Sequence, residues 1–293
     1  MSLLVYGTSF IIFRRASKVG RQRVRFLMSK QIAVVFLLTF IIHLISTVSY
    51  ALRIAGVRTG RIAVSFALSN LLLLVSRTSN TFQGPLLAKH VEQNIMRGTF
   101  QHAESDFRWL LLSATLATIV GALLIPTFQR LFTKAIGEFG LYRSIPRLVA
   151  GGLSRFSVRR LREVMSWPSK DNLTRLSWKK ASLNIIIYNL FATALLTVGV
   201  LASLYAGYLN PELRVTANSL SPVVNALSTI LLFIYIDPYL SLLTDDVVSS
   251  KATEADFRNM VVLFVGSRLA GTMLAQLMFL PAANIIVRVA KLL

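Results

Sequence analysis

Five polar residues lie within long apolar stretches of this chain, where such side chains are costly. Arg77 and Arg268 carry guanidinium groups and Asp237 carries a carboxylate. A charge at bilayer depth costs about 2.5–3.5 kcal/mol on insertion scales, so each must face protein, water or a ligand rather than lipid. Planar guanidinium forks suit phosphate and carboxylate groups, and two arginines against one carboxylate leave a net positive site. The residues predicted to bind an anionic headgroup are Arg77, Asn80, Gln83, Asp237 and Arg268.

Two alternatives to this interpretation stay open at the level of sequence. Arg77 could pair with Asp237 only to hold two helices in register. Three further arginines, Arg53, Arg58 and Arg61, flank the turn between the first two apolar stretches and are predicted to form a receiving patch at the cytoplasmic mouth. They could equally be the ordinary excess of positive charge on the cytoplasmic side of a membrane protein.

Catalytic and metal-binding patterns are missing from the sequence. It contains no cysteine, and its three histidines share no metal-ligand spacing. There is no nucleophile beside a base, no pair of carboxylates within a span and no P-loop. Asp245 and Asp246 are adjacent, but consecutive helical residues point about 100° apart, which favours a solvated helix end over a metal pair. We therefore expect no enzyme activity, no metal and no cofactor.

The elements that must position these residues are membrane helices. Hydrophobic residues make up 54% of the 293 residues, the mean hydropathy is +0.62, and the apolar residues come in blocks near the 20 residues that cross a bilayer. The fold class is therefore all-α, a polytopic membrane protein. Six transmembrane helices are predicted, at about 31–52, 62–88, 109–128, 184–208, 222–247 and 259–287.

The net charge of +20 comes from Lys and Arg that flank the apolar blocks. This placement favours anionic membrane lipids, rather than nucleic acid, as the partner. Counted from Met28, 17 basic residues fall on the side of the long loop and 7 on the other, so we expect that loop to be cytoplasmic and both termini to be outside. The predicted organisation is a basic N-terminal extension (1–29), a three-helix unit (30–128), a basic cytoplasmic loop with an interfacial helix (129–183) and a second three-helix unit (184–293).

Three short matches recur in the same order in both halves of the chain. TVSYALRIAG matches TVGVLASLYAG, ALSNLLLLVSRTS matches ALSTILLFIYIDP, and ESDFR matches EADFR. Ordered matches at each of three spans indicate duplication. Because each half has an odd number of spans, the second copy enters the membrane upside down, which predicts two inverted three-helix repeats.

The same comparison predicts where helices are interrupted. In the first half, the second helix meets SRTSN at residues 76–80, and in the second half its counterpart meets Ile236, Asp237 and Pro238. Hydroxyl side chains compete with the helix for backbone hydrogen bonds, and Pro238 is expected to move Asp237 away from the α region. Inverted-repeat transporters bind substrate near such breaks. Simple kinks in tilted helices are the alternative.

Several long runs resemble the Amj family, the alternate lipid II flippases of bacterial cell-wall synthesis. The resemblance covers roughly residues 30–291 and leaves out the N-terminal stretch, which supports the expectation that residues 1–27 are an extension. The runs are YALRIAGVRTGRIA, LLVSRTSNTFQGPLL, LIPTFQRLF, YAGYLNPELR, FIYIDPYLSLLTDDV, EADFR and VGSRLAGTMLAQL.

The resemblance implies a function that composition alone does not give. It implies a flippase that moves lipid II, the undecaprenyl-pyrophosphate-linked peptidoglycan precursor, from the inner to the outer leaflet of the bacterial cytoplasmic membrane. The alternative is a membrane enzyme or transporter that acts on another polyprenyl-phosphate-linked or anionic lipid. A pyrophosphatase of that kind would need the same cationic headgroup site together with an acid or a nucleophile.

Overall fold

The computed structural model describes residues 30–142, 165–168 and 182–293. Within these ranges six helical segments are long and apolar enough to cross a membrane, which confirms the predicted number of spans. The predicted N-terminal extension and most of the basic loop lie outside the described residues. Five spans are single helices: α2 (Lys30–Thr59), α3 (Ile62–Met96), α4 (Ala103–Tyr142), α8 (Leu183–Leu209) and α12 (Glu254–Leu292). The remaining span consists of η2 (Pro211–Leu213), α9 (Arg214–Ser219), α10 (Ser221–Leu231), η3 (Leu232–Ile236) and α11 (Asp237–Val248).

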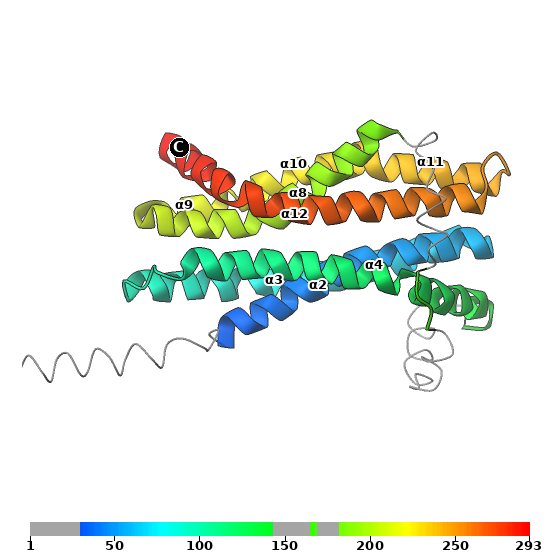
Figure 1. Ribbon diagram of the computed structural model, residues 1–293, viewed down its shortest axis with the longest axis horizontal. Coiled ribbons are helices and arrows are strands. Elements are labelled where there is room, and N and C mark those ends of the chain that lie inside the picture. The colour runs from blue at the N-terminus through cyan, green and yellow to red at the C-terminus, as the bar shows by residue number, and fades with distance from the viewer. Residues whose placement is uncertain (1–29, 143–164, 169–181) are drawn as a thin grey trace, which may run out of the picture.

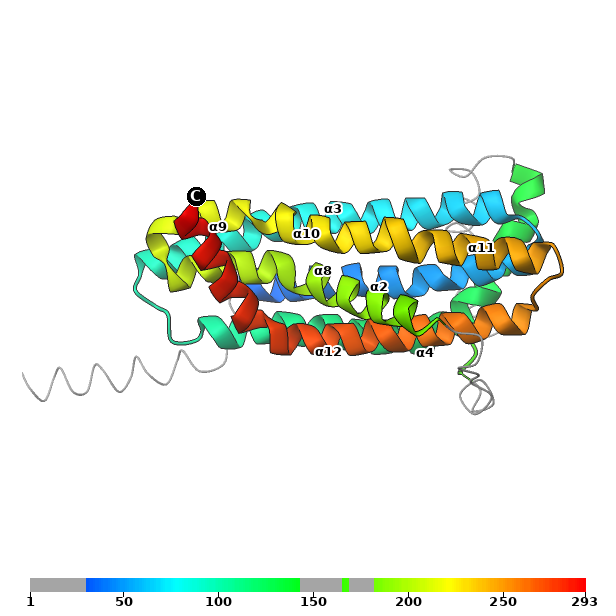
Figure 2. The same cartoon turned by 90° about the horizontal axis from the view of Figure 1, so that it is seen from above.

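The helices form two layers that correspond to the two halves of the sequence. Figure 1 shows α2, α3 and α4 in one layer and the helices from α8 to α12 in the other, all roughly parallel to the long axis. Helices that the sequence matches between the halves run in opposite directions, as six alternating spans require (Figures 1 and 2). This arrangement agrees with an inverted duplication, but the symmetry itself stays a prediction.

Glycine allows the first and third helices of each half to approach closely. A Cβ on Gly121 of α4 would lie 2.8 Å from Cβ of Thr47 on α2. A Cβ on Gly271 of α12 would lie 2.9 Å from Cβ of Thr193 on α8 and 2.5 Å from the Leu190 carbonyl oxygen. Both glycines follow the matched ESDFR and EADFR motifs at the same interval, and each packs against a threonine of the first helix of its half, although Thr47 and Thr193 are not matched positions. Without a hydrophobic driving force between helices in lipid, such small-residue contacts provide the packing.

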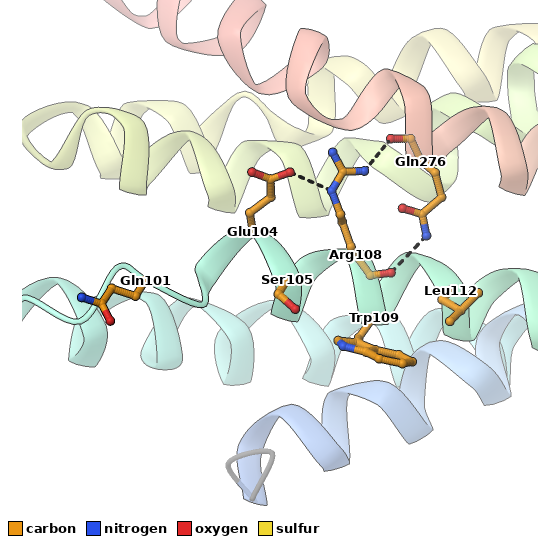
Figure 3. Close-up of a pocket in the computed structure, with 7 residues that line it drawn as sticks. All are labelled: Gln101, Glu104, Ser105, Arg108, Trp109, Leu112 and Gln276. Atoms are coloured by element: carbon orange, nitrogen blue, oxygen red, sulfur yellow. Dashed lines mark hydrogen bonds and ion pairs between the residues drawn. The ribbon is translucent and has the colours of Figure 1, made fainter. Parts of the chain in front are cut away.

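The two layers are joined along α4 and α12. Arg108 of α4 donates from Nη1 to the Gln276 carbonyl oxygen at 3.3 Å, and Gln276 of α12 donates from Nε2 to the Arg108 carbonyl oxygen at 3.0 Å (Figure 3). Nearby, Phe107 and Phe279 stack with their ring centroids 5.8 Å apart, and Tyr205 of α8 packs against both rings. These contacts fix the position of α12 relative to α4.

The predicted interruption of the second helix by SRTSN is wrong, because α3 is continuous through residues 76–80. The hydroxyls that could have competed with the helix instead bond to carbonyls one turn earlier, from Thr78 to Leu74 at 2.9 Å and from Ser79 to Val75 at 3.1 Å. Such bonds leave the backbone helical.

The predicted interruption near Asp237 takes another form. The π-helical turn η3 separates α10 from α11, and Asp237 itself is helical, with φ −65° and ψ −43°. The expectation that Pro238 moves Asp237 out of the α region is therefore wrong. Proline lacks a backbone N–H, and the wider π turn directly before it absorbs the resulting change in hydrogen-bond register.

The third span continues well past its predicted end at residue 128. Helix α4 contains Pro126 and extends to Tyr142, and Figures 1 and 2 show its last part turning across the end of the bundle. Ile136 is fully buried against Leu52 and Leu68. A proline kink redirects the helix without ending it, so the first part of the predicted basic loop covers the turn between α2 and α3.

Candidate functional site

Arg53 of α2 occupies the junction of three helices. Its Nη2 donates to Oδ1 of Asp237 on α11 at 2.9 Å. Its guanidinium carbon lies 5.2 Å from the ring centroid of Phe66 on α3, within the range of a cation–π contact. The Arg53 side chain is 17% exposed and that of Asp237 is 40% exposed. The ion pair therefore joins the two layers and is reached from the side of α11.

Arg268 lies behind this pair, within α12. It is buried, and its side chain lies beside that of Tyr50. Tyr50 precedes Arg53 by one helical turn, so both side chains project from the same face of α2. Tyr50 is also within electrostatic reach of Arg53 and Asp237. We call Tyr50, Arg53, Asp237 and Arg268 the arginine cluster.

Neighbouring polar contacts orient Arg268. Asn189 of α8 donates from Nδ2 to the Phe264 carbonyl oxygen at 3.0 Å and to Ser267 Oγ at 2.7 Å. The Phe264 ring packs on Tyr50, with the centroids 6.2 Å apart. Because Ser267 directly precedes Arg268, these bonds set the rotation of α12 and direct Arg268 toward α2.

The arginine cluster carries a net positive charge and has unpaired donors. It contains two guanidinium groups and one carboxylate, of which Arg53 and Asp237 form an ion pair, so its formal charge is +1. Nη1 of Arg53 and Nε of Arg268 are buried and have no hydrogen-bond partner in the described part of the chain. A buried donor of this kind costs about 1–3 kcal/mol when it is unsatisfied, and more when it carries charge. Phosphate oxygens are acceptors of the kind that such guanidinium donors bind.

The structure brings together only part of the predicted headgroup site. Asp237 and Arg268 belong to the arginine cluster, whereas Arg77 and Asn80 are exposed on α3 and Gln83 is buried on the face of α3 that packs inward. The alternative pairing of Arg77 with Asp237 is wrong, because Asp237 pairs with Arg53. Whether any of these residues binds substrate stays a prediction.

The sequence placed Arg53 in the predicted receiving patch and did not point to Tyr50. The spacing of these two residues could have shown that they belong to one site. A tyrosine and an arginine three residues apart in an apolar helix present a hydroxyl and a guanidinium on one face. Arg53 lies two turns before the end of α2, which is deep enough for its side chain to point into the bundle.

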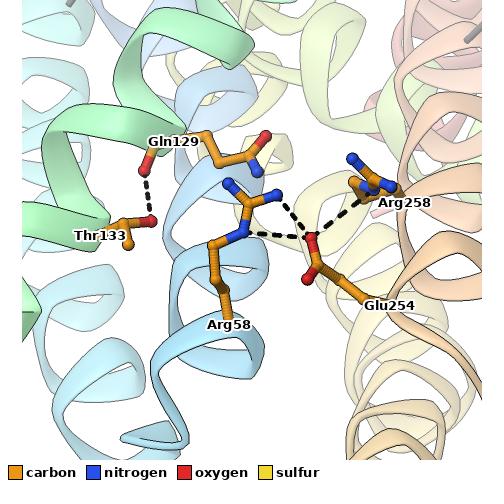
Figure 4. Close-up of polar contacts among 5 residues, drawn as sticks. All are labelled: Arg58, Gln129, Thr133, Glu254 and Arg258. Atoms are coloured by element: carbon orange, nitrogen blue, oxygen red, sulfur yellow. Dashed lines mark hydrogen bonds and ion pairs between the residues drawn. The ribbon is translucent and has the colours of Figure 1, made fainter.

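The other two arginines of the predicted receiving patch have structural contacts at the end of the bundle. Arg58 donates from Nε and Nη2 to Oε1 of Glu254, at 3.1 and 2.6 Å. Arg258 approaches the same oxygen at 3.7 Å, and Gln129 of α4 lies beside Arg58 (Figure 4). Arg61 donates to the carbonyl oxygens of residues 136 and 137. Arg58 therefore ties α2 to α12, and Arg61 ties the α2–α3 turn to α4.

Comparisons with known proteins agree with this architecture. The family described as Amj, Alternate to MurJ, matches residues 38–290. Lipid II flippase Amj of Bacillus subtilis (strain 168) is 34% identical over 262 residues, which cover 89% of this chain and 97% of that protein. No solved structure matches the chain. The resemblance predicted from the sequence motifs is confirmed, and the chain belongs to the Amj family.

Proposed function

We propose that this protein is a lipid II flippase of the bacterial cytoplasmic membrane. It moves the undecaprenyl-pyrophosphate-linked peptidoglycan precursor from the inner to the outer leaflet. The relative of that name, 34% identical over nearly its whole length, and the six apolar helices both support this proposal. The observation that carries it to the level of residues is the arginine cluster, a net positive site inside a membrane bundle.

The pyrophosphate of the substrate binds at Arg53 and Arg268, while the polyprenyl tail stays in lipid. Arg53 offers Nη1, Arg268 offers Nε, and both atoms are without a protein partner in the described residues. Asp237 is the most exposed member of the arginine cluster, so it is the partner of Arg53 that phosphate oxygens replace.

This exchange couples binding to motion. The Arg53–Asp237 pair connects α2 of the first layer to α11 of the second. A ligand that takes over the Arg53 guanidinium releases this connection, so headgroup binding favours separation of the layers near the cluster. A ligand shifts such an equilibrium only by its difference in affinity between the two states.

The two halves, 30–128 and 184–293, act as inverted repeats that exchange conformations. The matched contacts of Gly121 and Gly271 and the opposite directions of matched helices support this part of the proposal. The basic loop at 129–183 is cytoplasmic in this arrangement, and lipid II enters from its side. Rocking of one repeat against the other around a fixed site is the usual form of alternating access.

The alternative function is a membrane enzyme that hydrolyses a polyprenyl pyrophosphate. One experiment separates the two. Purified protein is reconstituted into vesicles with fluorescently labelled lipid II, and both translocation and phosphate release are followed. Translocation without phosphate release is expected. Phosphate release that depends on the protein, without translocation, would contradict the flippase proposal and support the enzyme.

A further inference from the structure

A second polar site lies at the opposite end of the bundle from Arg58 and Glu254. It is an open pocket of about 470 Å³ between the start of α4 and α12, within the range of roughly 300–1,000 Å³ typical of small-molecule sites. Figure 3 shows its residues along the first turns of α4, with Gln276 reaching in from α12. The lining residues are Gln101, Glu104, Ser105, Arg108, Trp109, Leu112 and Gln276.

The charges in this pocket cancel. Arg108 donates from Nε to Oε1 of Glu104 at 2.7 Å, and its Nη1 donates to the Gln276 carbonyl oxygen. The guanidinium is thus held by two bonds and neutralised by an adjacent carboxylate. Unlike the arginine cluster, with its net charge of +1, this pocket has no excess charge to attract a phosphate. It favours a neutral ligand.

The chemistry of the lining identifies the class of that ligand. Glu104 offers acceptor oxygens, Ser105 offers a hydroxyl, and Gln101 offers both an amide oxygen and an amide N–H. Trp109 is 51% exposed and contributes a flat aromatic surface to the pocket. Ligands with many hydroxyl and amide groups and one apolar ring face satisfy such a mixture. Sugars, and N-acetylated amino sugars in particular, have this chemistry.

We infer that this pocket binds the neutral, N-acetylated saccharide portion of the transported headgroup on the outer side of the membrane. The inference rests on the proposed function, because that function identifies a saccharide-bearing lipid as the substrate. The predicted orientation places the pocket on the outer face, since the end with Arg58 is then cytoplasmic. Pyrophosphate and sugar bind at separate sites, so the sugar site holds the headgroup after the arginine cluster has released it.

The test uses the full chain in lipid nanodiscs and the neutral disaccharide N,N′-diacetylchitobiose as the probe. Saturation-transfer NMR is expected to detect transfer of saturation from the protein to the acetyl and ring protons of the disaccharide. Trp109→Ala should weaken binding about fivefold to tenfold, as expected for removing an aromatic contact, and Trp109→Phe should weaken it less. Trp167→Ala is the matched control, because Trp167 is 68% exposed and lies outside the pocket.

The outcomes separate this inference from the proposed function. Chitobiose binding that is absent, or unchanged in Trp109→Ala, overturns the sugar site even if lipid II is translocated. Transfer to phosphoethanolamine that depends on Trp109, with none to chitobiose, overturns it in favour of a phospholipid headgroup. Failure of lipid II translocation with intact Trp109-dependent chitobiose binding overturns the flippase and keeps the sugar site.

Discussion

Replacing Arg53 with lysine tests the arginine cluster most directly. Lysine keeps the positive charge but replaces a planar fork of five donors with a point charge. In the structure, one Arg53 nitrogen bonds to Asp237 at 2.9 Å, and another, Nη1, has no hydrogen-bond partner among the described residues. A lysine that pairs with Asp237 has no equivalent second donor in the same plane to bind a phosphate oxygen.

The expected loss follows from that one contact. A hydrogen bond to a charged group contributes about 1.5–3 kcal/mol, so Arg53→Lys should weaken headgroup binding by roughly 10- to 150-fold. The cation–π contact with Phe66 contributes little to this difference, because lysine can also make one and exposed examples are worth about 0.5–1 kcal/mol. Folding should be nearly normal, since the ion pair between α2 and α11 can still form.

The assay is translocation in vesicles as a function of lipid II concentration, together with complementation in cells that lack their other flippase. Membrane levels of each variant are measured by immunoblot. Arg77→Lys is the matched control, because Arg77 is exposed on α3 and makes no ion pair within the described residues. Arg53→Lys should lose complementation at normal membrane levels, and Arg77→Lys should keep it.

Two results would refute this reasoning. If Arg53→Lys translocates lipid II with the affinity of the native chain, the guanidinium does not contact the headgroup. If Arg53→Ala lowers the amount of folded protein and the double change with Asp237→Ala restores both level and growth, the pair is only structural. In that case Arg268→Lys, which leaves the Arg53–Asp237 pair intact, becomes the remaining test of the site.

Two further predictions concern the scaffold. The chain has no native cysteine, so Arg58→Cys with Glu254→Cys can be joined by a short bifunctional thiol reagent. We expect translocation to stop when the ends of α2 and α12 are linked and to recover when the linker is cleaved; unchanged translocation in the linked protein would show that these ends do not separate. Gly271→Ala should lower the thermal stability of the purified protein more than Gly121→Ala does. A Cβ at position 271 would meet a backbone oxygen at 2.5 Å, whereas a Cβ at position 121 would meet a side chain at 2.8 Å. We expect each substitution to lower the free energy of unfolding by about 1–3 kcal/mol. A Cβ on Gly137 meets no atom of the described residues within 4 Å, so Gly137→Ala should not lower the melting temperature. Equal melting temperatures for all three variants would contradict the packing argument.

The sequence was sufficient for the spans and for two members of the arginine cluster. Blocks of apolar residues near 20 in length predict membrane helices because the bilayer requires that length. Arg268 and Asp237 stood out because charge at that depth is costly. The helices extend beyond the predicted spans, since only the part in hydrocarbon must be apolar and a helix continues freely into water.

The sequence does not reveal how α3 is rotated, so it could not show that Arg77 lies apart from the arginine cluster. The buried face of α3 carries small or polar residues, among them Ser69, Ser76 and Gln83, while leucines such as Leu74 face outward. Lipid solvates apolar side chains, so in a membrane the apolar face need not be the inner face. Arg77 follows Ser76 by about 100° around the helix, so it does not share the buried position of Ser76 and is exposed.

The two halves share glycine packing contacts but not the arginine cluster. The matched motifs align Gly121 with Gly271, and these glycines make the same helix contact in each half. In the same alignment, Thr118 is the residue that corresponds to Arg268. Thr118 donates a hydrogen bond within its own helix, to the Ala114 carbonyl oxygen. The matched glycines thus recur in both halves, while the arginine cluster does not. In the mechanism that we propose, two similar halves exchange conformations at little cost, and a single charged site binds the headgroup from whichever side is open.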